Sequence, residues 1–289
     1  PKSWEAATSD GERWRWLLLM AEESDSQRRW QVRQQYAHFM QEQFGVETLQ
    51  RWGYRPQQDA QDEQKTSLMT LTTLGEDEAL ARLANGIKRF KLPAAHNPIA
   101  LFQQIAEAHV SESAGAMEQL ARLFENRRQY PKAATWWARV IKEYGPGNNN
   151  YREEALKQIT GNWGRFEQGH TQAAGQGAEI EYRFRNGKQV KFEAFPIKVS
   201  KLLEDVKGYL RGKPGQVNWE QTDINNLGYR LVLKNQTQYL EDKVAEWQLN
   251  LDPRPEHFDR QFTVTTPLQK AGAYLVVASM ADGNVSRAV

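Results

Sequence analysis

The spacing of the hydrophobic residues changes just past the middle of the chain, and this change constrains the fold more than any other feature. In the first half, apolar residues recur every three or four positions, as at Tyr36, Phe39 and Met40, which is the period of an amphipathic helix. In the second half they alternate, as at Tyr182 and Phe184, which is the period of a strand with one buried face. We therefore predict an α+β multidomain chain in which an N-terminal α-helical domain precedes an antiparallel β-sandwich.

The domain boundaries follow from that change. We predict a helical domain over residues 1–163 and a linker over 164–177, where Gly, Gln and Ala occur without periodicity. A β-sandwich is predicted over 178–289, with a helical insert at about 198–242 where the segment SKLLEDVKGYLRG regains the helical period.

Cap and breaker residues predict where the helices begin and end. Asp10 is the expected N-cap of the first helix, and Asn97-Pro98 is an N-cap followed by proline at the first helical position. We expect a short helix at GEDEALARLANG, with acidic residues in its first turn and Asn85-Gly86 at its end.

The clearest internal pattern is AMEQLARLFENRRQYPKAATWWARVIKEYGPG, residues 116–147. It predicts two antiparallel helices, the second opened by Pro131, with Ala121 and Ala133 letting the helices approach closely. Large residues such as Trp137 would fill the gaps beside them. One convincing pair of this kind is tetratricopeptide-like, but a regular solenoid needs more repeats.

Turn residues predict two hairpins in the second half. Asn186-Gly187 suggests that the strands on either side pair through an odd-numbered loop that places Phe184 opposite Val190. Asp282-Gly283 suggests a two-residue loop that places Met280 opposite Val285. That register also sets Val276 opposite Val289.

The residues that carry chemistry are sparse. The chain has no cysteine, which excludes disulfides, cysteine-based zinc sites and a cysteine nucleophile or thioester within it. No nucleotide-binding loop, hydrolase elbow or metalloprotease motif is present. The five histidines are scattered; His257 and Asp259 share a strand face and suggest a local polar pair rather than an active site. We therefore predict no catalytic residue, no cofactor and no metal.

Charge and hydropathy restrict the partners. With 38 basic and 36 acidic residues, the formal net charge is +2, which gives little support to nucleic-acid binding. No apolar run approaches the roughly 18 residues that span a bilayer. Trp136, Arg127 and Arg128 are the candidate residues for binding a protein partner; Trp136 has the alternative of packing between helices.

Several segments resemble the amino-terminal region of large bacterial alpha-2-macroglobulin-like proteins. They are SLMTLTTLGEDEALARLANGIKRFKLP, ITGNWGRFE, AEIEYRFRNGKQVKFEAFPIKVSKLLEDVKGYL and FTVTTPLQKAGAYLVVASMADGN, of which YRFRNGKQVKFEA and TPLQKAGAYLV are the most specific. The resemblance covers most of residues 66–289. It implies that residues 178–289 form a macroglobulin-like domain and that the chain is an excised amino-terminal piece of a longer protein.

What the resemblance further implies is a parent protein in the periplasm, on the cell envelope or secreted, which traps proteases in defence. That family traps through a bait region and often a Cys-x-Glu-Gln thioester. Neither is present here, so no functional residue of the family can be assigned to a position of this sequence. The expectation is a non-catalytic structural or interaction region with protein partners. The alternative is a free-standing tetratricopeptide-like adaptor whose sandwich binds a ligand or carbohydrate.

Overall fold

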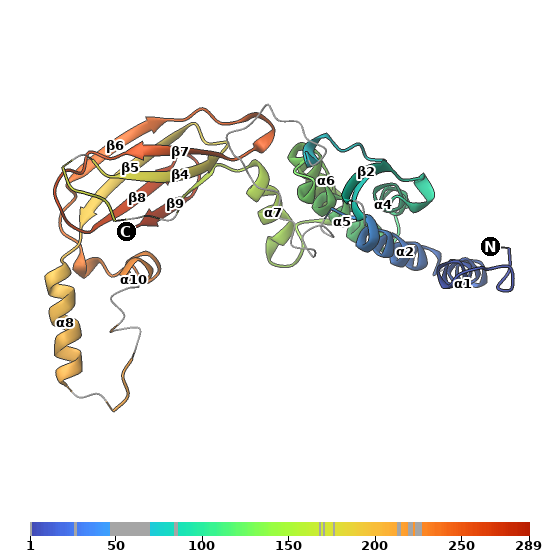
Figure 1. Ribbon diagram of the computed structural model, residues 1–289, viewed down its shortest axis with the longest axis horizontal. Coiled ribbons are helices and arrows are strands. Elements are labelled where there is room, and N and C mark those ends of the chain that lie inside the picture. The colour runs from blue at the N-terminus through green and yellow to red at the C-terminus, as the bar shows by residue number, and fades with distance from the viewer. Residues whose placement is uncertain are drawn as a thin grey trace. The chain divides into compact units, whose positions relative to one another are not determined.

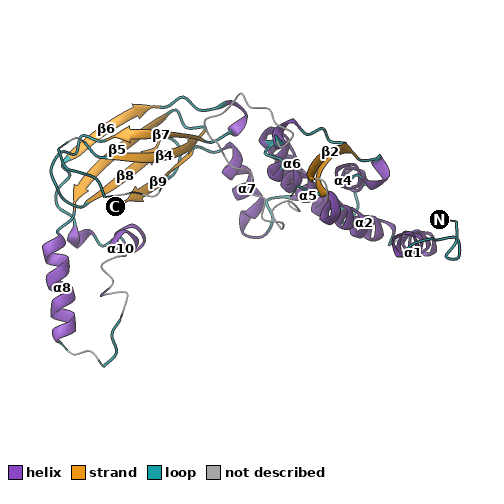
Figure 2. Cartoon of the chain, viewed as in Figure 1, coloured by secondary structure: helices purple, strands orange, loops and turns teal. Residues whose placement is uncertain are grey.

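The computed structural model describes residues 2–25, 28–46, 70–83, 86–167, 169, 171–175, 177–212, 215–218, 222 and 227–289. The chain divides into two compact units, Pro1–Ile159 and Thr160–Val289. Helices come first and antiparallel sheets follow (Figures 1 and 2), so the predicted α+β class is confirmed. No helix in the described ranges is long and apolar enough to cross a bilayer.

Two helices of the first unit begin at or beside the residues that were expected to cap them. Asn97 caps α4 by accepting a hydrogen bond from the Ile99 backbone, as predicted, whereas α1 is capped by Ser9 rather than Asp10. The helices are α1 (Asp10–Ser24), α2 (Arg29–Phe44), α4 (Pro98–Glu107), α5 (Ser113–Asn126), α6 (Tyr130–Tyr144) and α7 (Tyr151–Thr160).

The core of the first unit forms where α2, α4, α5 and α6 pack together. Ala121 and Ala133 are fully buried and Trp137 is 2% exposed, in agreement with the expected close approach of α5 and α6. Burial of a large apolar side chain in this core stabilises the fold by about 1.5–3 kcal/mol. The helix α1 contributes no buried side chain, although it is rich in tryptophan and leucine.

The helix predicted at GEDEALARLANG is wrong. That segment begins an antiparallel hairpin of β1 (Glu78–Leu83) and β2 (Gly86–Lys91), in which Leu83 pairs with Gly86. Gly86 has a φ of 111°, a conformation that glycine adopts easily and other residues rarely. Tertiary contacts override the local helix propensity here: β1 gains a partner strand, and Ala79 and Leu80 become fully buried. Asn85 lies outside the described residues.

The second unit contains, within its described residues, a three-stranded sheet of order β3-β4-β7 and a four-stranded sheet of order β6-β5-β8-β9. Phe166 of β3 packs in the core between these sheets, beside Tyr182 and Phe192. The first residues of the predicted linker are therefore a strand that belongs to the sandwich. The strands are β3 (Trp163–Phe166), β4 (Glu179–Arg185), β5 (Gln189–Pro196), β6 (Ala245–Asn250), β7 (Arg260–Thr265), β8 (Tyr274–Met280) and β9 (Val285–Ala288).

The hairpin predicted between β4 and β5 is also wrong, because the two strands lie in different sheets. Asn186, with a φ of 58°, turns the chain from one sheet to the other, and its side-chain amide donates to the Gly161 carbonyl at 2.9 Å. Phe184 and Val190 are both buried, but they meet across the sandwich core rather than along one sheet. Alternation alone cannot distinguish these arrangements, because each strand presents one buried face in both.

The C-terminal hairpin forms with a register one residue away from the prediction. Ser279 pairs with Val285, and the loop takes three residues because the Met280 backbone donates to the Asn284 carbonyl at 3.0 Å. A one-residue shift moves every side chain to the other face. Val285 and Val289 are accordingly 48% and 45% exposed.

Asn284 ties this hairpin to the other sheet. Its side-chain oxygen accepts from the Gly164 N–H at 2.8 Å and its amide nitrogen donates to the Gly164 carbonyl at 2.9 Å. Asn162 donates in return to the Ala281 carbonyl at 3.0 Å. These bonds satisfy backbone groups on the edge of β3 that would otherwise lack partners.

The helical insert packs on the outer side of the four-stranded sheet. It comprises α8 (Val199–Arg211) and α10 (Leu227–Lys234), followed by a 3-10 turn at Thr237–Tyr239. Leu202 and Val206 of α8 join Leu275 of β8 in a small second core. Residues 213–214, 219–221 and 223–226 of the predicted insert lie outside the described residues.

We expect Gly164→Ala to destabilise the second unit by about 2 kcal/mol. A β-carbon at Gly164 would lie 2.0 Å from the Tyr182 hydroxyl oxygen, inside the packed core. Gly208→Ala in α8 is the matched control, because a β-carbon there meets nothing within 4 Å and alanine favours helix by roughly 1 kcal/mol. Chemical denaturation monitored by circular dichroism measures both; equal stability of the two variants would contradict the packing described here.

Candidate functional site

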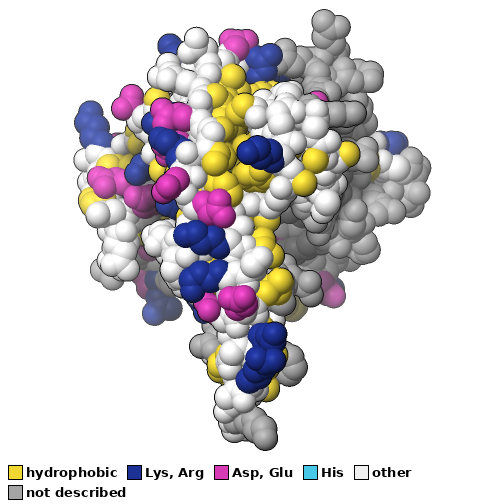
Figure 3. Space-filling model, turned by 90° about the vertical axis from the view of Figure 1, so that its left-hand side faces the viewer, with side chains coloured by type: hydrophobic (Ala, Val, Ile, Leu, Met, Phe, Trp, Pro, Cys, Tyr) yellow, Lys and Arg dark blue, Asp and Glu magenta, His cyan; other side chains and the backbone are white. Residues whose placement is uncertain are grey.

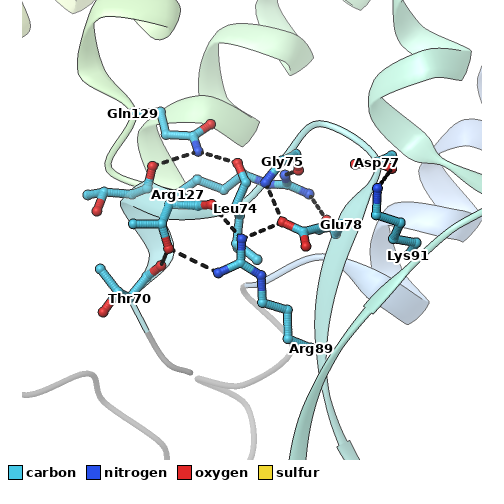
Figure 4. Close-up of polar contacts among 11 residues, drawn as sticks. Thr70, Leu74, Gly75, Asp77, Glu78, Arg89, Lys91, Arg127 and Gln129 are labelled. Carbon is cyan, nitrogen blue, oxygen red and sulfur yellow. Dashed lines mark hydrogen bonds and ion pairs between the residues drawn. The ribbon is translucent and has the colours of Figure 1, made fainter. Parts of the chain in front are cut away.

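Arg127, one of the predicted binding residues, is 2% exposed and belongs to an internal clasp (Figure 4). Its guanidinium donates to the carbonyls of Gly75 at 2.8 Å and Glu78 at 2.9 Å. Gln129, from the same turn between α5 and α6, donates to the Leu74 carbonyl at 2.7 Å. The turn thereby holds the segment that leads into the β1–β2 hairpin, and Arg127 serves the fold rather than an external partner.

A second arginine closes the other side of the same segment. Arg89 of β2 forms an ion pair with Glu78 and donates to the carbonyl and hydroxyl oxygens of Thr73. The Glu78 carboxylate also accepts from the Gly75 N–H at 2.6 Å. The hydrogen bond from Arg89, followed by that from Gly75, lowers the pKa of Glu78 from 4.5 to about 2. This is a charged contact that fixes a hairpin.

Trp136 is half-buried in α6 and packs partly against the core. The Arg139 guanidinium lies 5.2 Å from the centre of its ring, within the range of a cation–π contact. Arg139 also pairs with Glu107 and, at 2.7 Å, with Glu143, and these carboxylates raise its pKa. The Trp136 ring therefore packs against the core and also lies against the Arg139 guanidinium, which is itself paired with carboxylates.

Arg128 is half-buried with a φ of 55° at the turn between α5 and α6. Trp136 lies about 9 Å farther along the helix axis from the start of α6, at 1.5 Å per residue. Of the three residues predicted from the sequence, Arg127 is buried, whereas Arg128 and Trp136 are half-buried.

Polar side chains in the second unit gather beside the turn from β4 to β5. The predicted pair of His257 and Asp259 is not formed: Asp259 binds Arg185 at 2.7 Å, and the His257 Nδ1 lies 2.8 Å from the Asn186 side-chain oxygen. Burial, with a smaller contribution from Arg185, lowers the pKa of His257. Arg185 also lies over the ring of Trp163, at 5.3 Å. These contacts hold the turn between β4 and β5 and the strand β3 in place.

No metal centre is assembled among the residues that the structure describes, where groups of three or more His, Cys, Asp or Glu side chains do not converge. The acidic pair at 153–154, which has the context of a helix N-terminus, is exposed in the first turn of α7.

A groove of about 1010 Å³ lies at one end of the sandwich, where β5 leads into α8 and the chain enters β6 and β8. Its walls come from three separated segments, 196–201, 241–245 and 267–274. Figure 3 views this end of the unit and shows hydrophobic side chains gathered in a band, with basic and acidic side chains around it. We call this feature the end groove.

The end groove was not predicted from the sequence. Its signals in the sequence are apolar residues within polar loops, such as Val244 and the Pro267-Leu268 pair. Three loops that are far apart in sequence form it, and periodicity does not report which loops meet. Only the pairing of β5 with both β6 and β8 brings them together.

Comparison with known proteins gives two similarities among solved structures. The chain is similar to a crystal structure of native alpha-2-macroglobulin from Escherichia coli spanning domains MG0-NIE-MG1, with 17% identity and a TM-score of 0.28, over 44% of this chain and 38% of that one. It is also similar to a structure of the same protein spanning domains NIE-MG1, with 16% identity and a TM-score of 0.25, over 44% of this chain and 59% of that one.

The chain thus spans less than two thirds of either macroglobulin fragment. Both TM-scores are too low for an argument about function. No protein-family model matches the sequence, and no curated protein matches it.

We expect Arg127→Ala to lower the free energy of unfolding of the first unit by about 3 kcal/mol, because the carbonyls of Gly75 and Glu78 lose a charged donor in a buried site. Arg122→Ala, an exposed position on α5, is the control and should change stability by less than about 0.5 kcal/mol. Denaturant titration compares the two variants. Similar stabilities would show that the clasp contributes little.

The Glu78–Arg89 pair should make the stability of the first unit depend on pH. Because folding lowers the pKa of Glu78 from 4.5 to about 2, its contribution is complete above pH 4.5 and is lost as the pH falls towards 2. Glu78→Gln should remove this component, and Arg89→Gln should reduce it, because the Gly75 N–H still donates to the carboxylate. Thermal unfolding across that pH range measures it; an unchanged pH profile in both variants contradicts the assignment.

Proposed function

We propose that this chain is a non-catalytic structural and interaction region of a large bacterial alpha-2-macroglobulin-like protein of the envelope or the extracellular space. The observation that carries the proposal is where the charged side chains of the described residues point. Groups with perturbed pKa values are bound in ion pairs: Glu78 pairs with Arg89 in the β1–β2 hairpin, and Arg139 pairs with Glu107. An enzyme would have such groups converge on a pocket.

The exposed apolar surface supports an interaction role. Leu17 and Leu19 of α1 are 48% and 49% exposed, and Leu203 and Leu210 of α8 are 44% and 46% exposed. Exposed apolar residues gathered on one helix are typical of surfaces that bind other proteins. The sequence segments most specific for the macroglobulin resemblance, 182–194 and 266–276, form strands of the sandwich and a wall of the end groove.

The alternative, an adaptor whose sandwich binds carbohydrate, has less support. Carbohydrate sites usually present an exposed aromatic platform, because ring faces stack on sugars. Among the residues of the second unit whose exposure the structure describes, the aromatic side chains are buried or half-buried. Trp247, for example, stacks on Phe192 with ring centres 5.1 Å apart.

An antibody raised against this chain tests the proposal on fractionated cells of the source organism. We expect a band far heavier than the 33.4 kDa of the chain, in the envelope or the medium, whose native-gel mobility changes when a protease is added. A band near the mass of the chain itself, in any fraction, would support the adaptor instead. A heavy band that does not respond to proteases would leave the interaction role but refute protease trapping by the parent.

A further inference from the structure

We propose that the end groove is the docking site for an acidic, partly apolar peptide segment of a protein partner. This inference deepens the proposed function, since it assigns the interaction role to one surface and to one class of ligand. It stands on the charge of the groove, on the fixed geometry of its walls and on the apolar side chains that line it.

The charge of the end groove is predominantly positive. Lys198, Lys201 and Lys270 line it, and Glu241 is the acidic residue in the lining, as far as the described residues show. Lys201 is bound to Asp205 at 3.2 Å. Lys198 and Lys270 are both exposed, and within the described part of the chain no ion pair is formed by either. A ligand with carboxylates would complement these two ammonium groups, and their attraction would raise its rate of association.

The walls of the end groove are fixed by hydrogen bonds rather than left as loose loops. The Ile197 N–H donates to the Ala273 carbonyl at 2.9 Å, and the Lys198 N–H donates to the Tyr239 carbonyl at 2.7 Å. The Tyr274 hydroxyl donates to the Lys270 carbonyl at 2.9 Å. A site held in this way before the ligand arrives loses less conformational entropy on binding.

Apolar side chains also line the groove. Val199 is 37% exposed and Val244 is 56% exposed, and Pro267, Leu268 and the ring of Tyr274 contribute to the same walls. Alternating acidic and apolar side chains on an extended peptide would satisfy both features, because such a chain presents its side chains to opposite sides.

Two other anionic partners fit less well. A nucleic acid needs many phosphate contacts, whereas the lining offers three lysines together with a glutamate. A membrane surface is broad and does not enter a concave groove, and membrane-bound helices present a projecting apolar face instead. A peptide is narrow enough to enter, and its mixed composition matches the mixed lining.

Selection from a library of random displayed peptides on the whole chain tests the proposal. The expected winners carry aspartate or glutamate interspersed with apolar residues, and they bind more weakly as salt concentration rises. A synthetic copy of the strongest winner, measured by fluorescence anisotropy, should bind Lys198→Glu/Lys270→Glu roughly tenfold more weakly than the unaltered chain. Val244→Ser should also weaken binding, with the fold kept because this side chain is exposed.

Lys188→Glu is the matched control. This lysine is exposed in the turn between β4 and β5 and does not line the groove, so its reversal changes the net charge of the chain without touching the site. It should leave the peptide affinity unchanged.

Three results would overturn the proposal. They are a selection without enrichment, winners that lack acidic residues, and winners whose binding is unchanged in Lys198→Glu/Lys270→Glu. Tighter binding of phosphatidylserine vesicles or of a short oligonucleotide through the same lysines would also replace the peptide as ligand. None of these outcomes depends on the mass of the parent protein, so the antibody experiment and this one fail independently.

Discussion

The layer of aromatic side chains between the two sheets is the interaction on which the second unit depends. Tyr182 lies edge-on to Phe192 with ring centres 5.4 Å apart, and Phe192 stacks on Trp247 at 5.1 Å. Such pairs add about 0.5–1.5 kcal/mol each beyond the area that they bury. Because β4 and β5 contribute to this layer from opposite sheets, the chain must cross between the sheets at Asn186, and the polar contacts of that turn follow from this requirement.

In the first unit, a β-hairpin is held in place by polar contacts from the turn between α5 and α6. A buried guanidinium is costly unless its N–H groups have acceptors. Arg127 meets that condition by donating to the carbonyls of Gly75 and Glu78, backbone groups at the entry to the hairpin. The contact explains why a residue that looks like a surface cation in the sequence is buried.

Sequence reasoning succeeded where the signal was local. The Asn97 cap and the small residues Ala121 and Ala133 at the contact of α5 and α6 are where they were predicted. It failed where the competing arrangements share one local pattern: the alternation around Tyr182 fits a hairpin and a sandwich equally, and Asp282-Gly283 fits a two-residue and a three-residue loop. The candidate binding residues follow from residue type alone. Residue type does not show that the Arg127 guanidinium reaches a backbone carbonyl about 50 residues earlier.

The class of the protein is readable from its residues: helices come first, antiparallel strands second, and cysteine chemistry is absent, because period, caps and composition act over a few residues. The strand order, the hairpin at Glu78 and the end groove become visible in the folded chain alone. These depend on which distant segments share a hydrophobic core, and that choice is made by the packing of the whole unit. A loop such as 267–274 acquires a binding wall only when β8 has paired with β5.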